Sequence, residues 1–173
     1  MPFRKSKLYP GKVIPGEEDH QIWRTKWCCA SVIAENEKMD KLFESVVNKA
    51  LCWESYSFIK EVYAFEHGNF GTVEERHAQL VTLLQMYIAP GCSYEVNISH
   101  AMQKLALKNK SFDVFKQKTE DDQKQVLHEQ RNEILSMLNQ NLVQCLHRHP
   151  EFMSTCSDIE EANQLEDMAE TGE

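Results

Sequence analysis

Glycine and proline are confined to a few short stretches of this chain, and that distribution limits what it can fold into. Residues 17–67 and 92–149 contain neither of them. Because glycine weakens a helix and proline breaks it, stretches free of both favour long helices. Apolar residues recur within them at intervals of three and four, the spacing of a helix with one buried face. The sequence therefore predicts an all-α fold.

Two helices are expected before residue 70. An apolar stripe over residues 39–51 predicts the first of them. A second stripe over residues 58–65 predicts the next helix. The Gly68-Asn69 pair that follows is typical of a left-handed C-terminal cap, so this helix should end there.

A third helix is expected to pair with the second. Thr72 and Glu75 form a capping box, which predicts the helix start, and the apolar stripe continues over residues 80–88. Pro90-Gly91 should end this helix. Since the connection between the two helices is short, we expect them to form a central antiparallel pair.

The C-terminal half should contain two more helices. Ser99 can cap a short helix that runs to Leu107. Thr119, with Asp122 three residues later, predicts the start of one long helix that continues to Leu146.

Charge divides the chain into three parts. Residues 151–173 hold eight acidic residues and no Lys or Arg, which leaves 19 acidic and 19 basic residues before them. We expect a flexible basic arm (1–18), a helical domain (19–150) and an acidic tail (151–173), in which either a helix from Ser157 or disorder is expected. A neutral body without a basic stripe argues against a nucleic-acid partner.

The cysteines and the hydropathy pattern indicate an intracellular chain. Six cysteines without a secretory signal favour reduced thiols over disulfides. No segment approaches the apolar run of about 18 residues that a membrane-spanning helix needs. We therefore expect a cytoplasmic protein that reaches the plasma membrane only through a partner.

Two motifs lie at the ends of the expected antiparallel pair. They are Cys52-Trp53-Glu54-Ser55-Tyr56-Ser57-Phe58 and Tyr87-Ile88-Ala89-Pro90-Gly91-Cys92-Ser93-Tyr94-Glu95-Val96-Asn97-Ile98-Ser99. Together, in their order and with the helices between them, they resemble the RGS domain, a multi-helix bundle that accelerates GTP hydrolysis by heterotrimeric G-protein α subunits. The resemblance covers residues 27–150. Glu54, Phe58 and Asn97 match the family pattern, whereas Ser55 stands where the family has Asn.

The resemblance implies a function without bond-breaking chemistry. The chain would bind an activated α subunit, in its GTP or transition-state form, and would need no cofactor and no catalytic residue of its own. We expect it to act as a monomer. Asn97 would contact the hydrolytic Gln of the partner, because an amide both donates and accepts hydrogen bonds. Glu54 and Ser55 would face the same partner surface.

Each of these residues also has a plain structural interpretation. Asn97 could be a turn residue that bonds its own backbone. Glu54 could simply be an acidic residue at the positive end of a helix.

A third contact region departs from the family. Aligning the apolar run that includes Met137 puts Asn141, Leu142 and Cys145 where the family supplies Asp, Ser and Arg. Charge-assisted hydrogen bonds contribute about 1.5–3 kcal/mol, so their loss would weaken activation by roughly one or two powers of ten. Two alternatives therefore stay open: an RGS-like adaptor that binds a signalling partner without activating a GTPase, and a helical scaffold for an unrelated partner.

One cluster of metal-ligand types could suggest zinc binding. Cys145, His147, His149 and Cys156 lie within twelve residues. Their spacing matches no Cys-X-X-Cys pair, and residues two apart on a helix point to different sides. We therefore expect no metal site.

Overall fold

The computed structural model describes residues 17–171, and over this range the chain forms helices and no strand, so the predicted all-α fold is confirmed. The basic arm predicted for residues 1–18 lies outside the described residues except for the first two residues of α1. In chain order the helices are α1 (Glu17–Lys26), α2 (Ala30–Ala34), α3 (Glu37–Lys49), α4 (Trp53–His67), α5 (Val73–Leu83), the π-helical turn η1 (Leu84–Ile88), α6 (His100–Leu107), the 3₁₀ turn η2 (Lys108–Lys110), α7 (Phe112–Phe115), α8 (Glu120–Lys124), α9 (His128–Asn141), α10 (Val143–His147) and α11 (Phe152–Thr171).

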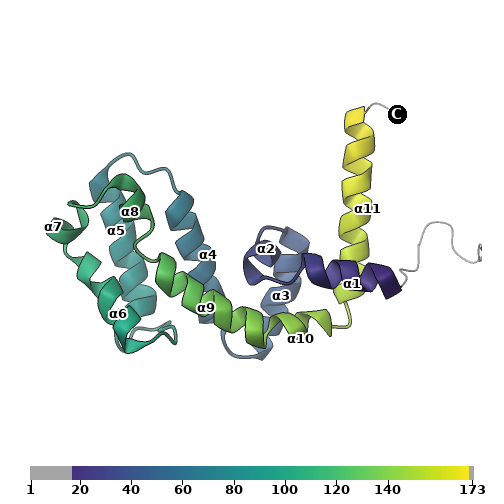
Figure 1. Ribbon diagram of the computed structural model, residues 1–173, viewed down its shortest axis with the longest axis horizontal. Helices are drawn as coiled ribbons and strands as arrows, with labels where there is room; N and C mark the ends of the chain where they lie inside the picture. The colour runs from purple at the N-terminus through teal and green to yellow at the C-terminus, as the bar shows by residue number, and fades with distance from the viewer. Residues whose placement is uncertain (1–16, 172–173) are drawn as a thin grey trace, which may run out of the picture.

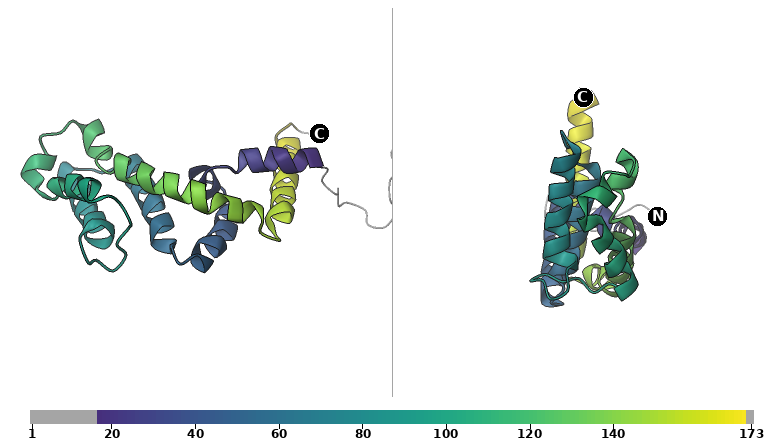
Figure 2. Two further views of the ribbon diagram at one scale, coloured as in Figure 1. Left: turned by 60° about the horizontal axis from the view of Figure 1, so that its bottom comes forward. Right: turned by 90° about the vertical axis from the view of Figure 1, so that its left-hand side faces the viewer.

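The helices form an elongated molecule with two layers (Figures 1 and 2). Helices α3, α4 and α5 make one layer, and α6, α9 and α10 lie against it. Helices α4 and α5 run side by side in opposite directions, as expected from their short connection (Figure 1). One continuous apolar core joins the layers; its largest fully buried side chains include Phe43, Phe58, Phe65, Tyr87, Phe115 and Phe152.

Helix α3 ends at Lys49, before the end of the apolar stripe that predicts it. Asn36 caps its start, because the Asn36 side chain accepts a hydrogen bond from Met39 N at 3.1 Å. The helix ends at Lys49, and Leu51 then takes a left-handed conformation with φ of 55°. Leu51 is 86% exposed. The expectation that Leu51 belongs to the buried stripe is therefore wrong, since the chain has already turned toward α4 at that residue.

The end of α4 also differs from the prediction. Gly68 is extended, with φ of −65°, and is not a left-handed cap. Glycine is required there by a close approach, because a Cβ atom on Gly68 would lie 2.8 Å from the Phe70 ring. The Phe70 ring packs against Phe65 in α4, with ring centroids 5.6 Å apart. The predicted helix end is right in position, but packing and not backbone handedness selects the glycine.

The predicted starts of α5 and α6 are confirmed. Thr72 Oγ1 accepts a hydrogen bond from Glu75 N at 3.1 Å, and the Glu75 carboxylate accepts one from Gly71 N at 3.0 Å. Ser99 caps α6 by accepting from Met102 N at 3.4 Å. The third predicted helix ends before Pro90, as expected, although its last turn is π-helical.

The single long helix expected after Thr119 is wrong. Thr119 caps α8 as predicted, but α8 ends at Lys124, α9 begins at His128, and a second break at Leu142 separates α9 from α10. The Gln123 amide accepts from Arg76 of α5 at 2.7 Å and donates to the Lys118 carbonyl at 3.1 Å. The Arg76 bond ties α8 to α5, and the Lys118 bond ties it to the connection that precedes it.

The acidic tail begins as part of the packed structure. Helix α11 starts at Phe152, and its residues Phe152, Cys156 and Ile159 are buried against the domain. Trp23 of α1 donates its indole N–H to Glu160 on the same helix. The packed helices therefore extend beyond residue 150, whereas the second half of α11 projects away from the other helices (Figure 1). None of the helices between residues 17 and 171 is both long enough and apolar enough to cross a membrane.

Candidate functional site

Three chain connections meet along one edge of the molecule, and the predicted site residues lie on them. They are the turn from α3 to α4, the loop of residues 89–99 from η1 to α6, and the junction of α9 with α10. All three lie along the lower border of Figure 1. We call this border, with the first turn of α4, the lower edge. Helices α4 and α9 are antiparallel, so the start of α4 lies near the end of α9.

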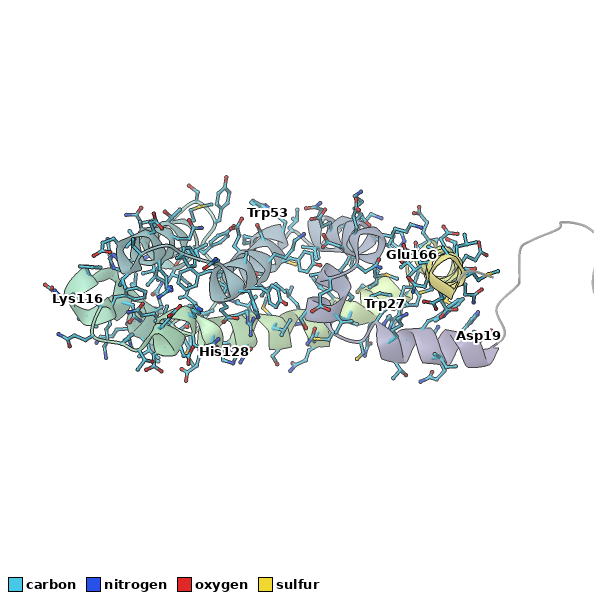
Figure 3. All side chains as sticks on the ribbon, turned by 90° about the horizontal axis from the view of Figure 1, so that it is seen from above. Asp19, Trp27, Trp53, Lys116, His128 and Glu166 are labelled. Atoms are coloured by element: carbon cyan, nitrogen blue, oxygen red, sulfur yellow. The ribbon has the colours of Figure 1, made fainter. Side chains whose placement is uncertain are left out.

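The first turn of α4 presents Trp53 and Glu54. Trp53 is 42% exposed, and Figure 3 shows its side chain on the outer side of the α4 layer. Glu54 is half-buried. Ser55 differs from the expectation, because it is only 2% exposed on the face of α4 that packs into the core. Its hydroxyl therefore does not lie on the surface of the lower edge.

The loop of residues 89–99 is held firmly on η1. Tyr94 N and Val96 N donate to the carbonyls of Met86 and Tyr87 at 3.3 and 2.9 Å. The Glu95 carboxylate closes the loop, since it accepts from Gly91 N at 2.8 Å and from the Gln103 amide at 3.2 Å. The Glu95 and Val96 positions of the motif thus have structural roles.

Asn97 is the exposed member of this motif. It follows the buried Val96 and precedes the half-buried Ile98. Its side-chain amide makes no hydrogen bond with any residue in the described part of the chain. The hydrogen bond from the Asn97 side chain to its own backbone, which the structural interpretation requires, is therefore not present in the described part of the chain. Its amide is free to donate and accept at the surface.

An aromatic pair joins this loop to the start of α4. Trp53 and Tyr94 contact each other edge to face, with ring centroids 4.9 Å apart. Behind them the Tyr87 hydroxyl lies 3.1 Å from Ser57 Oγ. Glu54 and Asn97, which are far apart in sequence, are thereby brought to the same edge. Sequence reasoning did not assign Trp53 or Tyr94 to the site, although both are large aromatic residues inside the two motifs.

At the junction of α9 with α10, most of the predicted site residues are buried or make contacts within the chain. The Asn141 amide donates to the Met137 carbonyl of its own helix at 2.9 Å. Leu142 is only 9% exposed, and Met137 is half-buried against the core. Cys145 is exposed, with Sγ 3.6 Å from the Asn141 carbonyl. At this junction the predicted site residues thus supply the lower edge with the Asn141 amide and the Cys145 thiol, and with no charged group.

Arg131 cannot replace the missing charge at that junction. It lies in the first turns of α9, at the end remote from the lower edge, as does His128, which is labelled in Figure 3. Its guanidinium forms an ion pair with Glu66, whose side chain is almost fully buried. His128 Nδ1 lies 3.4 Å from the same carboxylate. Sequence reasoning missed this cluster because Glu66 and Arg131 are 65 residues apart along the chain.

The candidate zinc ligands serve other contacts or face solvent. His147 Nε2 lies 2.8 Å from the Trp27 carbonyl, Cys156 is buried, and Cys145 is exposed. Among residues 17–171 no group of three or more ligand-type side chains is arranged to hold a metal ion.

No protein-family model matches the chain, and a search of curated proteins finds no significant match either. The function of the chain is therefore inferred from its residues and from the geometry of the lower edge.

Proposed function

We propose that this chain is a regulator of G-protein signalling that binds activated heterotrimeric G-protein α subunits and accelerates their GTP hydrolysis. The lower edge would grip the switch segments of the partner in the form they take during hydrolysis. Binding the transition state more tightly than the ground state lowers the barrier without any catalytic group on this chain. The partner would bring the chain to the plasma membrane.

The exposed amide of Asn97 is the observation that carries the proposal. It lies on a loop that is fixed by backbone bonds to η1 and by the Glu95 carboxylate. A fixed loop lets an amide orient a partner's Gln without first losing conformational freedom. Asn97 also lies on the same edge as the acidic Glu54 and the exposed aromatic pair of Trp53 and Tyr94.

The aromatic pair suits an interface with a protein. Large aromatic side chains supply much of the binding energy where they are covered by a partner. Trp53 and Tyr94 are exposed yet held by their mutual contact, so little freedom is lost when a partner covers them. We assign them the role of apolar anchors beside Asn97.

The junction of α9 and α10 favours a second candidate, an RGS-like adaptor that binds without activating. Asn141 bonds its own helix, and Leu142 is turned into the core. Without charge at these positions, the hold on the partner's first switch would be weaker than in a strong activator.

Binding to two nucleotide states of a panel of α subunits distinguishes these functions. We expect affinity to rise at least about tenfold from GDP alone to GDP with aluminium fluoride, which mimics the transition state, and single-turnover GTP hydrolysis to accelerate in parallel. An adaptor would bind without this preference and without acceleration. Absence of binding to every α subunit in calorimetry would overturn both functions.

A further inference from the structure

A surface rich in lysine lies at the end of the molecule opposite α11 (Figures 1 and 2). It is formed by residues 104–118, which run from α6 through η2 and α7 to the connection before α8. Figure 3 shows Lys116 at this end. Only Ala106, Asn109 and Phe115 are buried in this range. We call residues 104–118 the lysine surface.

Positive charge is concentrated on the lysine surface. It has five lysines and one acidic residue, Asp113, whose carboxylate forms an ion pair with Lys116 at 2.7 Å. The remaining lysines form no salt bridge with any residue of the described chain: Lys104, Lys108, Lys110 and Lys118. Their ammonium groups are therefore free to meet an anionic partner.

The acidic residues that follow in sequence are those of the first turn of α8, namely Glu120, Asp121 and Asp122. The Glu120 carboxylate is paired with Arg76 and Lys124. The Asp122 carboxylate accepts from the Thr119 hydroxyl at 2.8 Å. Two of these three acidic residues are thus bound to groups outside the lysine surface, which keeps its excess of positive charge.

Two exposed aliphatic side chains lie among these lysines. Leu105 is 44% exposed on α6, where Lys104 precedes it and Lys108 lies one turn further along the same side of the helix. Val114 is 45% exposed on α7. The two aromatic rings of α7 pack instead against His77 of α5, with ring centroids 5.2 Å away for Phe112 and 5.1 Å away for Phe115. The lysine surface thus presents aliphatic and cationic groups together.

The negative charge of the chain is gathered at the other end of the molecule. The net charge is −8, and residues 151–173 hold eight acidic residues and no Lys or Arg. Most of these residues lie on α11, which projects at the far end from α7 (Figure 1). At physiological ionic strength, exposed charges are screened beyond about 8 Å. An anionic partner that meets the lysine surface is therefore not repelled by α11.

We propose that the lysine surface docks the chain directly on an anionic phospholipid bilayer. The lysine ammonium groups meet the lipid phosphates, and Leu105 and Val114 enter the boundary between head groups and acyl chains. The apolar stem of each lysine lies along this boundary while its charged end reaches the phosphates. This contact needs no α subunit, so it is independent of the proposed function and adds to recruitment by a partner.

The composition of the surface favours a bilayer over a nucleic acid. Single-stranded nucleic acids bind through aromatic side chains on which the bases stack. On the lysine surface Phe112 is half-buried and Phe115 is fully buried, and both rings face α5. The exposed apolar groups are aliphatic, and such side chains are stabilised by transfer into lipid.

Sedimentation of the full chain with two kinds of vesicle tests the proposal. We expect binding to phosphatidylcholine vesicles that contain phosphatidylserine to be at least about tenfold stronger than binding to phosphatidylcholine alone. Added salt should weaken it. Lys108→Glu with Lys110→Glu should lower this binding at least about tenfold. The matched control, Lys49→Glu with Arg148→Glu, makes the same change of charge at exposed positions elsewhere and should lower it less than about twofold.

The basic residues of the N-terminal segment stay unchanged in every variant, so a loss confined to the first pair belongs to the lysine surface. Equal binding to the two kinds of vesicle, or equal losses in the two double variants, would overturn the proposal.

A second pair of substitutions tests the aliphatic contact. Leu105→Gln with Val114→Thr keeps every charge and should lower vesicle binding about threefold or more, because less apolar surface enters the lipid. Circular dichroism and the melting temperature check that each variant is folded. Binding to a single-stranded RNA should be weaker than binding to the vesicles. RNA binding as tight as vesicle binding, with no effect of the aliphatic substitutions, would assign the surface to a nucleic acid and overturn the proposal.

Discussion

At the residue scale, Leu51 carries the clearest backbone strain. It is the one non-glycine residue with positive φ among residues 17–171, and its side chain is almost fully exposed. Leu51→Gly should raise the free energy of unfolding by about 0.5–1 kcal/mol, because relief of strain exceeds the entropy that glycine gains in the unfolded chain. Chemical denaturation measures this. Leu105→Gly, at an exposed position inside α6, should instead lower stability by about 1 kcal/mol.

Asn97 allows a residue-scale test of the proposed function. Asn97→Ala should reduce acceleration of GTP hydrolysis at least about tenfold, because one hydrogen bond made in the transition state is worth that much. The melting temperature should stay unchanged, since the Asn97 side chain makes no hydrogen bond within the described chain. Asn132→Ala, at an exposed position on α9, is the matched control. A destabilised domain with full activity per folded molecule would instead assign Asn97 a purely structural role.

At the scale of elements, the ion pair between Glu66 and Arg131 joins α4 to α9. Arg131→Met leaves the Glu66 carboxylate buried without its cation and should destabilise the domain by about 3–5 kcal/mol. Adding Glu66→Leu should recover most of that loss, because a buried pair can be replaced by apolar residues. A double-mutant cycle in urea measures the coupling. Additive losses would mean that the pair is not coupled.

The junction of α9 and α10 is a second element that can be tested. Cys145 Sγ lies beside the Asn141 carbonyl, so the two positions are neighbours across the helix break. Asn141→Asp with Cys145→Arg should build an ion pair on the lower edge and raise GTPase acceleration above that of the unmodified chain. Each single change should give less than half of the gain in free energy. A folded double variant with no gain would mean that this junction does not hold the partner's first switch.

At the scale of the whole molecule, α11 divides into a packed half and a projecting half. A chain truncated after Gln164 keeps Phe152, Cys156 and Ile159 and should lose less stability than a chain that lacks all of α11. A chain truncated after Pro150 loses these buried side chains and should be destabilised by about 3–5 kcal/mol or more. Thermal unfolding of the two truncated chains measures the difference. Equal losses would place the stabilising contacts of α11 in its acidic second half.

Local patterns in the sequence account for the helices and most of their starts. The absence of glycine and proline predicted the all-α fold, and the caps at Thr72, Ser99 and Thr119 are present as predicted. These features depend on residues within one helical turn, so the sequence determines them before any tertiary contact forms. Asn97 could also be singled out from its motif, although its role stays a prediction.

Tertiary structure decided where helices break and which site residues reach the surface. No glycine or proline marks the breaks after Lys124 and at Leu142; side-chain contacts with distant helices accompany the first of them. Ser55 and Leu142 share motifs with exposed residues, yet packing turns them inward. The Trp53–Tyr94 contact and the contact of the Asn139 amide with Cys29 likewise join residues that are far apart along the chain. Such placements depend on how helices pack across the whole chain, which a local pattern does not contain.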